Sequence, residues 1–104
     1  MLKIIVFIPK KFCEKVKEEM FKAGAGKFKN YDYCSFETEG IGQFRPLKNA
    51  KPFVGTIEKL EKVIEVRVEM ICDEHCLENV VSAMRKSHPY VEVAFDVISL
   101  VKIK

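Results

Sequence analysis

The chain has 104 residues, 48% of them hydrophobic, which fits one domain spanning residues 1–104 with a sizeable core. Its 18 basic and 15 acidic residues are interleaved and give a net charge of +3, which disfavours a dedicated nucleic-acid binder. No apolar run reaches the length of a membrane span, and no signal peptide is visible. Four scattered cysteines indicate reduced thiols and a cytoplasmic location rather than a disulfide scaffold.

The first part of the chain predicts a strand, a helix and a second strand. Leu2–Ile8 carries apolar residues at alternate positions on both faces, which is typical of a central strand that is covered on both sides. Apolar residues at helical spacing predict a helix over Lys11–Ala23, with Gly24 as its C-terminal stop. Alternation over Tyr33–Glu39 then predicts the second strand.

Two glycines follow this second strand. We expect Gly40 and Gly42 to adopt positive φ at a bulge or turn, which lets the strand bend and pair with a neighbour. Phe44-Arg45-Pro46 ends the segment. The polar connection Leu47–Leu60 is long enough to be a functional loop rather than a tight turn.

The second part of the chain predicts a strand, a helix and a last strand. Ile64–Met70 alternates apolar and charged residues, a second helix follows Asp73 as its cap and stops at Pro89, and the last strand covers Val91–Ile103. The order strand, helix, strand, strand, helix, strand predicts an α+β fold of the ferredoxin-like βαββαβ type. Its four-stranded antiparallel sheet has both helices on one face.

The sheet face without helices carries a predicted apolar patch, to which Ile5, Phe7, Ile98 and Leu100 contribute. Contiguous apolar surface of this kind is rarely left in water, so another copy of the chain is the simplest cover.

Cys72, His75 and Cys76 form a C-x-x-H-C motif at the start of the second helix. Thiolate and imidazole ligands suit a divalent or soft metal ion, which is the candidate cofactor. A closed zinc site needs four ligands, however, and the other cysteines lie in distant elements. Burial of Cys72 as a small hydrophobic residue is the favoured alternative.

The sequence gives little support for RNA binding or catalysis. RNA-recognition domains of this element order stack bases on aromatic residues of the central strands, whereas the predicted third strand has Glu65, Arg67 and Glu69. His75 and His88 lie at opposite ends of the second helix, so they cannot share a site within one chain. Nucleic acid is not expected as a partner, and no catalytic residue is assigned.

The stretch Asn30–Pro46, N-Y-D-Y-C-S-F-E-T-E-G-I-G-Q-F-R-P, resembles the N-Y-D-x-C-S-F-x-T-x-G-x-G-x-F-x-P pattern of the YqfO group in the Nif-three-like family. Pro52–Gly55, Val66–Glu69 and Ser87–Tyr90 fit the same pattern, so the resemblance covers residues 1–100. It implies a PII/CutA-like domain of the kind inserted between two halves of a dimetal-binding protein. This chain resembles a stand-alone version of that insert. The family's metal ligands lie in flanking halves that this sequence lacks, so the hydrolase activity is not carried over.

The resemblance also implies a homotrimer with strands that pair across subunits. The residues then expected at the oligomer interface are Gly40, Gly42, Phe44, Glu65, Arg67 and Glu69. Charges there have to be paired or hydrated, because isolated buried charge is costly. The alternative is a solvated polar face in a monomer.

The leading hypothesis for function is an oligomeric, ligand- or metal-responsive binding module without enzymatic activity. One alternative is a metal-assisted hydrolase whose inter-subunit site uses Asp32, Cys34 and His88. Another is a protein-interaction module that docks through the loop Leu47–Leu60.

A small-molecule or metal site is expected in a cleft between subunits, where hydroxyl, carboxylate, thiol and imidazole groups gather at strand ends and loops. We expect the C-terminus of the second helix to favour protonated His88. The alternative is that His88 only caps the helix and that Tyr90 packs on the sheet edge. The residues predicted to line the site are Tyr31, Asp32, Cys34, Thr38, His88 and Tyr90.

Overall fold

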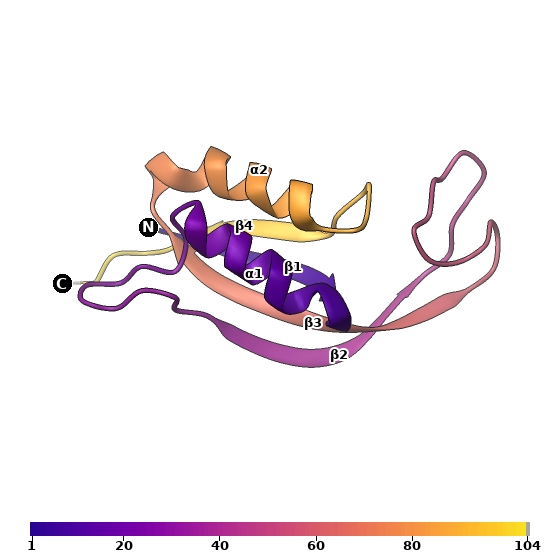
Figure 1. Ribbon diagram of the computed structural model, residues 1–104, viewed down its shortest axis with the longest axis horizontal. Helices are drawn as coiled ribbons and strands as arrows, with labels where there is room; N and C mark the ends of the chain where they lie inside the picture. Colours follow the sequence, from indigo (N-terminus) through magenta and orange to yellow (C-terminus); the bar gives the residue numbers. More distant parts are fainter. Residues whose placement is uncertain (104) are drawn as a thin grey trace.

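The computed structural model describes residues 1–103 and has two layers, a sheet and a pair of helices on one of its faces (Figure 1). The antiparallel sheet has the order β2-β3-β1-β4, which confirms the predicted ferredoxin-like class. No helix within residues 1–103 is long and apolar enough to cross a membrane. In chain order the elements are β1 (Leu2–Pro9), a 3-10 turn (Lys10–Phe12), α1 (Cys13–Lys22), β2 (Phe36–Phe44), β3 (Glu61–Cys72), a second 3-10 turn (Glu74–Cys76), α2 (Leu77–Ser87) and β4 (Phe95–Ser99).

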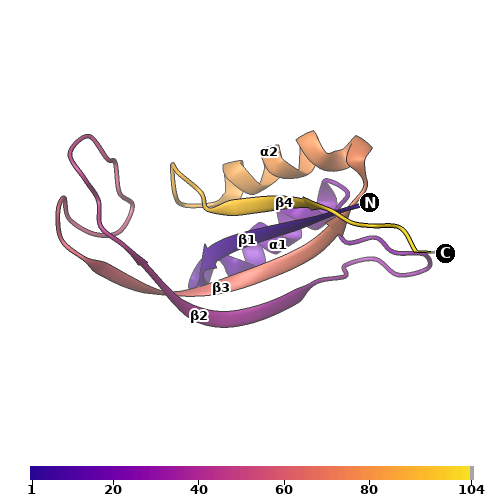
Figure 2. The same ribbon diagram turned by 180° about the vertical axis from the view of Figure 1, so that it is seen from behind.

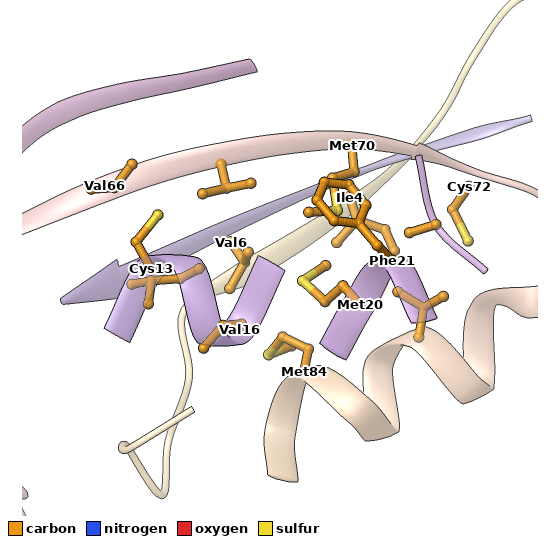
Figure 3. Packing of buried hydrophobic residues seen from close by; sticks show 14 residues of the cluster. Ile4, Val6, Cys13, Val16, Met20, Phe21, Val66, Met70, Cys72 and Met84 are labelled. Carbon is orange, nitrogen blue, oxygen red and sulfur yellow. The ribbon is translucent and has the colours of Figure 1, made fainter. Parts of the chain in front are cut away.

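The core lies between the helices and the two central strands (Figure 3). Alternate residues of β1 and β3 point toward the helices because side chains alternate between the faces of a strand. The helices meet them with apolar residues at helical spacing, and each fully buried side chain of this kind stabilises the fold by about 1.5–3 kcal/mol. The fully buried members include Ile4, Val6, Ile8, Val16, Met20, Val68, Val80 and Met84. Gly24 ends α1 with a φ of 120°, as predicted.

β2 and β3 are longer than predicted, and together they project beyond the helices (Figure 1). Gly40 and Gly42 lie inside β2 without positive φ, and pairing with β3 is unbroken from Phe36↔Glu69 to Phe44↔Glu61. The predicted bulge or turn at these glycines is therefore wrong. Glycine tolerates ordinary extended backbone as well as positive φ, so its presence alone does not end a strand.

We call residues 40–65 the arm, and the remaining residues the body. The arm consists of the distal β2–β3 ribbon and the loop 45–60. β1 pairs with β3 only as far as Pro9↔Glu65, so the ribbon is two-stranded beyond that point. The arm lies at the opposite end of the molecule from both chain termini (Figure 2).

β4 is shorter than the predicted strand Val91–Ile103. It covers only Phe95–Ser99, which pair with Leu2–Val6 of β1. One further backbone bond continues the contact at each end, from Leu100 N–H to the Met1 carbonyl and from Phe7 N–H to the Ala94 carbonyl, each at 3.2 Å. Residues 91–94 instead form a loop that turns from α2 back to the sheet.

The open sheet face is more polar than predicted. Ile5 is 4% exposed and thus already covered within the chain. Glu69 pairs with Lys3 and with Arg67, each at 3.5 Å, so charges occupy the middle of this face. Apolar surface remains at Phe36 and Ile98, which are 68% and 46% exposed.

Candidate ligand-binding cavity

A cavity of about 770 Å³ lies between the arm and the body. The body contributes Phe7 at the end of β1 and the loop after α2, while the arm contributes the end of β2, part of the loop 45–60 and Glu65. A volume of this size is within the range of small-molecule sites. The side chains and backbone that line it belong to Phe7, Gly42–Pro46, Asn49–Val54, Glu65, Tyr90–Glu92 and Ala94.

Aromatic rings form the contact between the arm and the body. The Tyr90 ring centroid lies 6.1 Å from that of Phe44 and 6.3 Å from that of Phe53. Phe53 also meets Phe12 edge-on at 5.7 Å, just before α1. Edge-to-face and tilted arrangements at these distances are favourable for aromatic pairs. The loop 45–60 is therefore held against the body through the ring of Phe53.

Glu65, Gly42 and Tyr90 form the polar corner of the cavity. The Glu65 side chain leans along the ribbon over Gly42, and a Cβ atom at Gly42 would collide with its carboxyl group. The Tyr90 hydroxyl is buried and makes no hydrogen bond of standard geometry. It lies near enough to Glu65 that burial and this carboxylate together raise the pKa of Tyr90 to about 12. Burial also raises the pKa of Glu65.

His88 holds the loop behind this corner and is 6% exposed. Its Nδ1 accepts a hydrogen bond from the Tyr90 backbone N–H at 3.0 Å, and its Nε2 lies 2.8 Å from the Phe7 carbonyl oxygen. Since the carbonyl only accepts, Nε2 carries the proton and the ring is neutral. Burial lowers the pKa of His88. The expectation that the helix end favours the protonated form is therefore wrong, because Nδ1 accepts the Tyr90 N–H and burial disfavours a charged ring.

The structure does not bring the predicted ligand residues together within one chain. Tyr31 and Asp32 are exposed in the loop before β2, and Thr38 is exposed on β2 opposite Arg67. Tyr90, in contrast, lines the cavity.

Cys34 and His88 lie near opposite ends of the sheet. Cys34 N–H bonds to Gly26, whose own N–H bonds to Ile71 across from Lys3. His88 reaches Phe7, and the four residue steps of β1 from Lys3 to Phe7 span about 13 Å. The predicted site would thus need residues from two chains.

The C-x-x-H-C motif does not form a compact metal site in one chain. Within residues 1–103 it is not among the groups of three or more ligand atoms lying within 4.8 Å of one another. Cys72 is buried and its thiol lies 3.2 Å from the Asp73 carbonyl, whereas His75 is exposed. The Cys76 sulfur packs against Gly24. These residues fit packing better than metal binding.

Cys13, Glu14 and Glu37 do lie within 4.8 Å of one another. The Lys17 ammonium group already bonds to both carboxylates, at 3.1 Å to Glu14 and 2.7 Å to Glu37. Burial and the charge of Glu37 raise the pKa of Cys13 to about 11, so its thiol stays protonated at neutral pH. The cluster is best explained as an ion pair that ties α1 to β2.

The cavity was not predicted from the sequence. Glu65, Gly42 and Phe44 were expected at an oligomer interface, and Phe53 was not among the predicted site residues. A usable signal was present in Pro52-Phe53, since an aromatic residue in a polar loop needs an apolar surface to pack on. Tyr90 was predicted for a site, although with different partners.

No family model matches the chain. Its sequence is 46% identical over 95 residues to the "GTP cyclohydrolase 1 type 2 homolog" of Bacillus subtilis, covering 91% of this chain and 26% of that protein. The crystal structure of a Bacillus cereus protein related to NIF3 superposes with a TM-score of 0.85 at 39% identity, over 97% of this chain and 26% of that one. CutA1 from Pyrococcus horikoshii superposes with a TM-score of 0.72 at 18% identity, over 100% and 87%. Over nearly its whole length this chain is similar to one segment of NIF3-related proteins, and its fold is CutA-like.

This chain spans about a quarter of the length of the curated relatives that it matches. GlnK of B. subtilis shares the fold, with a TM-score of 0.52 at 13% identity over 94% of this chain and 84% of that one. These likenesses confirm the PII/CutA-like resemblance that Asn30–Pro46 indicated in the sequence.

Proposed function

We propose that this domain is an oligomeric, ligand-responsive binding module whose ligand occupies the cavity between the arm and the body. The observation that carries the proposal is the composition of the cavity wall. Gly42–Pro46 and Asn49–Val54 come from the arm, whereas Phe7 and Tyr90–Glu92 come from the body. A ligand that fills this space contacts both parts at once.

A ligand at this junction changes how firmly the loop 45–60 is held. In the free chain Phe53 is 56% exposed although it touches Phe12 and Tyr90. A ligand that prefers the closed arrangement shifts the population of loop positions toward it, by as much as its affinities for the two arrangements differ. The outer surface of the loop then presents a ligand-dependent shape to a partner.

The proposal is tested by screening small molecules of different charge by thermal shift and confirming binding by NMR. A ligand of the cavity raises the unfolding temperature by mass action and shifts resonances of Phe7, Phe53 and Tyr90. Phe53→Ala should weaken binding. Leu47→Ala, in the same loop but outside the cavity wall, serves as the matched control. If ligands stabilise both variants and the parent equally, binding is elsewhere.

We further propose that the oligomer is a trimer in a cytoplasmic setting, as the family resemblance implies. Two edge strands, β2 and β4, have one unpaired side each, and Phe36 and Ile98 leave apolar surface on the open face. All four cysteines are free thiols, which suits a reducing compartment. Light scattering at micromolar concentration should give three times the 12.0 kDa of one chain. A monomeric mass contradicts this assembly.

A second candidate is a protein-interaction module that docks through the loop, and exposed apolar residues favour it. Leu47, Ile57 and Leu60 are 59%, 41% and 60% exposed. Replacing Leu47 and Leu60 by Ser should abolish a protein complex while leaving cavity ligands bound. The hydrolase alternative gains no support, because both ring nitrogens of His88 are engaged within its own chain.

A further inference from the structure

We infer that the cavity binds the protonated amine of a small apolar molecule, with the Glu65 carboxylate as counter-charge and aromatic rings around the apolar part of the ligand. This inference rests on the proposed function and names the chemical class of its ligand. It follows from three features of the polar corner and one of the wall.

The first feature is a carboxylate without a cationic partner. Glu65 is half-buried, yet it forms no ion pair with any residue of the described chain up to Ile103. By contrast Glu69, four residues along the same strand and on the same face, is paired with both Lys3 and Arg67. Charges removed from water are normally paired, so an unpaired one in a cavity wall indicates a missing cation.

The second feature is the room that the chain leaves for this carboxylate. Gly42 lies diagonally across the β2–β3 pair from Glu65, and any side chain there would collide with the carboxyl group. At Gly40, two residues away, an added Cβ meets nothing within 4 Å. The Glu65 carboxyl group therefore occupies space over Gly42 that a side chain at this position would fill.

The third feature is the phenol of Tyr90, which is buried beside the carboxylate and makes no hydrogen bond of standard geometry, although the Glu65 carboxylate lies near enough to raise the pKa of Tyr90. Its neutral oxygen can accept one hydrogen bond and its O–H can donate one. An ammonium group, which carries only donors, can bond to the carboxylate while Tyr90 donates to the other carboxylate oxygen. This arrangement satisfies both groups, as a buried polar pair requires.

The cavity wall around the polar corner suits a cation that is attached to an apolar group. Phe7, Phe44, Phe53 and Tyr90 all line the cavity. Aromatic faces attract cations as well as burying apolar surface.

Other charged groups at the cavity do not reverse this preference. Arg45, Lys51 and Glu92 also line the cavity. Neither Arg45 nor Lys51 forms an ion pair with Glu65. The carboxylates of Glu65 and Glu61 both raise the pKa of Tyr90, so the charges that act on this hydroxyl are negative. A metal ion fits less well, since Glu65 is not part of any cluster of three ligand groups within residues 1–103.

The test uses three probes that share the same apolar part and differ in the charge of their polar group. They are 2-phenylethylamine, 2-phenylethanol and phenylacetate. Their dissociation constants are measured on the full chain at neutral pH by calorimetry or NMR titration. We expect the amine to bind about tenfold tighter than the alcohol, as a charge-assisted hydrogen bond provides, and the carboxylate to bind most weakly.

Two variants sharpen the test. Glu65→Gln keeps the shape of the side chain and should reduce the amine-to-alcohol ratio to about one. Glu69→Gln removes a charge from the same face but outside the cavity, and should leave the ratio unchanged. Gly42→Ala should lower amine affinity by displacing the carboxylate, whereas Gly40→Ala should not. Unfolding curves establish that each variant is folded.

The outcomes separate this inference from the proposed function. If the alcohol binds in the cavity as tightly as the amine, or phenylacetate binds best, the ligand class is wrong and the ligand-binding function stands. If the amine preference survives in Glu65→Gln, Glu65 is not the counter-charge. If none of the probes shifts cavity resonances, both the inference and the cavity as a ligand site are overturned.

Discussion

Val66 and Ile64 lie two residues apart on the same face of β3, yet their environments differ completely. Val66 is 4% exposed beneath the helices, whereas Ile64 is 54% exposed in the arm. Ile41, the cross-strand partner of Ile64, is 72% exposed. The strand and its alternation are continuous across this boundary, so the difference arises from what covers the strand and not from the strand itself.

The body and the arm are consequently stabilised in different ways. The body is held by buried apolar side chains from both layers. The arm is held by backbone pairing and by ring contacts such as Phe53 with Phe12. Regions with few buried contacts open at low free energy, which is where ligand-binding loops are usually found.

The largest expected effect contrasts one substitution in the two regions. Ile4→Ala, in the body, should lower the free energy of unfolding by about 3 kcal/mol through lost burial and a cavity. Ile64→Ala, in the arm, should lower it by less than about 1 kcal/mol because the side chain is already exposed. Urea denaturation measures both. Equal losses would show that another copy of the chain covers the arm.

Valine substitutions at Gly40 and Gly42 should give a smaller difference in the free energy of unfolding. Gly42→Val should cost about 1–2 kcal/mol because Glu65 has to move, and Gly40→Val should be near neutral because the space there is open. Light scattering of the same samples tests the prediction that Gly42→Val weakens assembly more than the fold. If helix content and oligomer mass both survive Gly42→Val, the glycine has no role in assembly.

A pH titration should separate the loop at the cavity from the rest of the body. Because burial lowers the folded-state pKa of His88, the neutral ring contributes stability above its ordinary pKa of 6.5. That contribution is lost as pH falls through the lowered folded-state value. Protonated Nδ1 can no longer accept the Tyr90 N–H. The free energy of unfolding, measured between neutral and mildly acidic pH, should show this decline. The decline should be absent in His88→Gln and present in the control His75→Gln, because His75 is exposed.

The smallest effect on the chain itself is expected at the open face. Phe36→Ser should change monomer stability by less than about 0.5 kcal/mol, because the ring is 68% exposed. It should nevertheless lower the mass seen by light scattering if the open face is an interface. Thr38→Ser, also on this face, is the control. An unchanged oligomer in Phe36→Ser would place the interface elsewhere.

The fold was predictable where burial follows the sequence pattern. Ile4, Val6 and Ile8 in β1 and Val66, Val68 and Met70 in β3 alternate because one layer of helices covers them. The extent of the arm was not predictable in this way. No helix covers Ile41 or Ile64, so hydrophobic alternation carried no signal about where β2 ended and β3 began.

The candidate site was less accessible from sequence, because its members become neighbours only through the fold. Glu65 looked like one of three equivalent strand charges, and only the absence of an ion partner distinguishes it from Glu69. Gly42 was expected at a bulge or turn with positive φ, whereas it lies in regular strand where a Cβ atom would collide with the Glu65 carboxyl group. Tyr90 was predicted as a ligand residue, but its contact with the arm depends on the orientation of the β2–β3 ribbon relative to the body.

The end of pairing at Pro9↔Glu65 makes the arm a mechanical lever. Up to that pair β1 supports the β3 side of the ribbon, and beyond it neither outer side of the ribbon is paired, so Glu65 lies at the fulcrum. The ribbon from Glu65 to Glu61 adds about 13 Å before the loop begins, and displacement grows with distance from a pivot. A small movement of the Glu65 carboxylate at the fulcrum therefore becomes a larger movement at the tip of the loop 45–60, which is where a partner molecule would contact the arm.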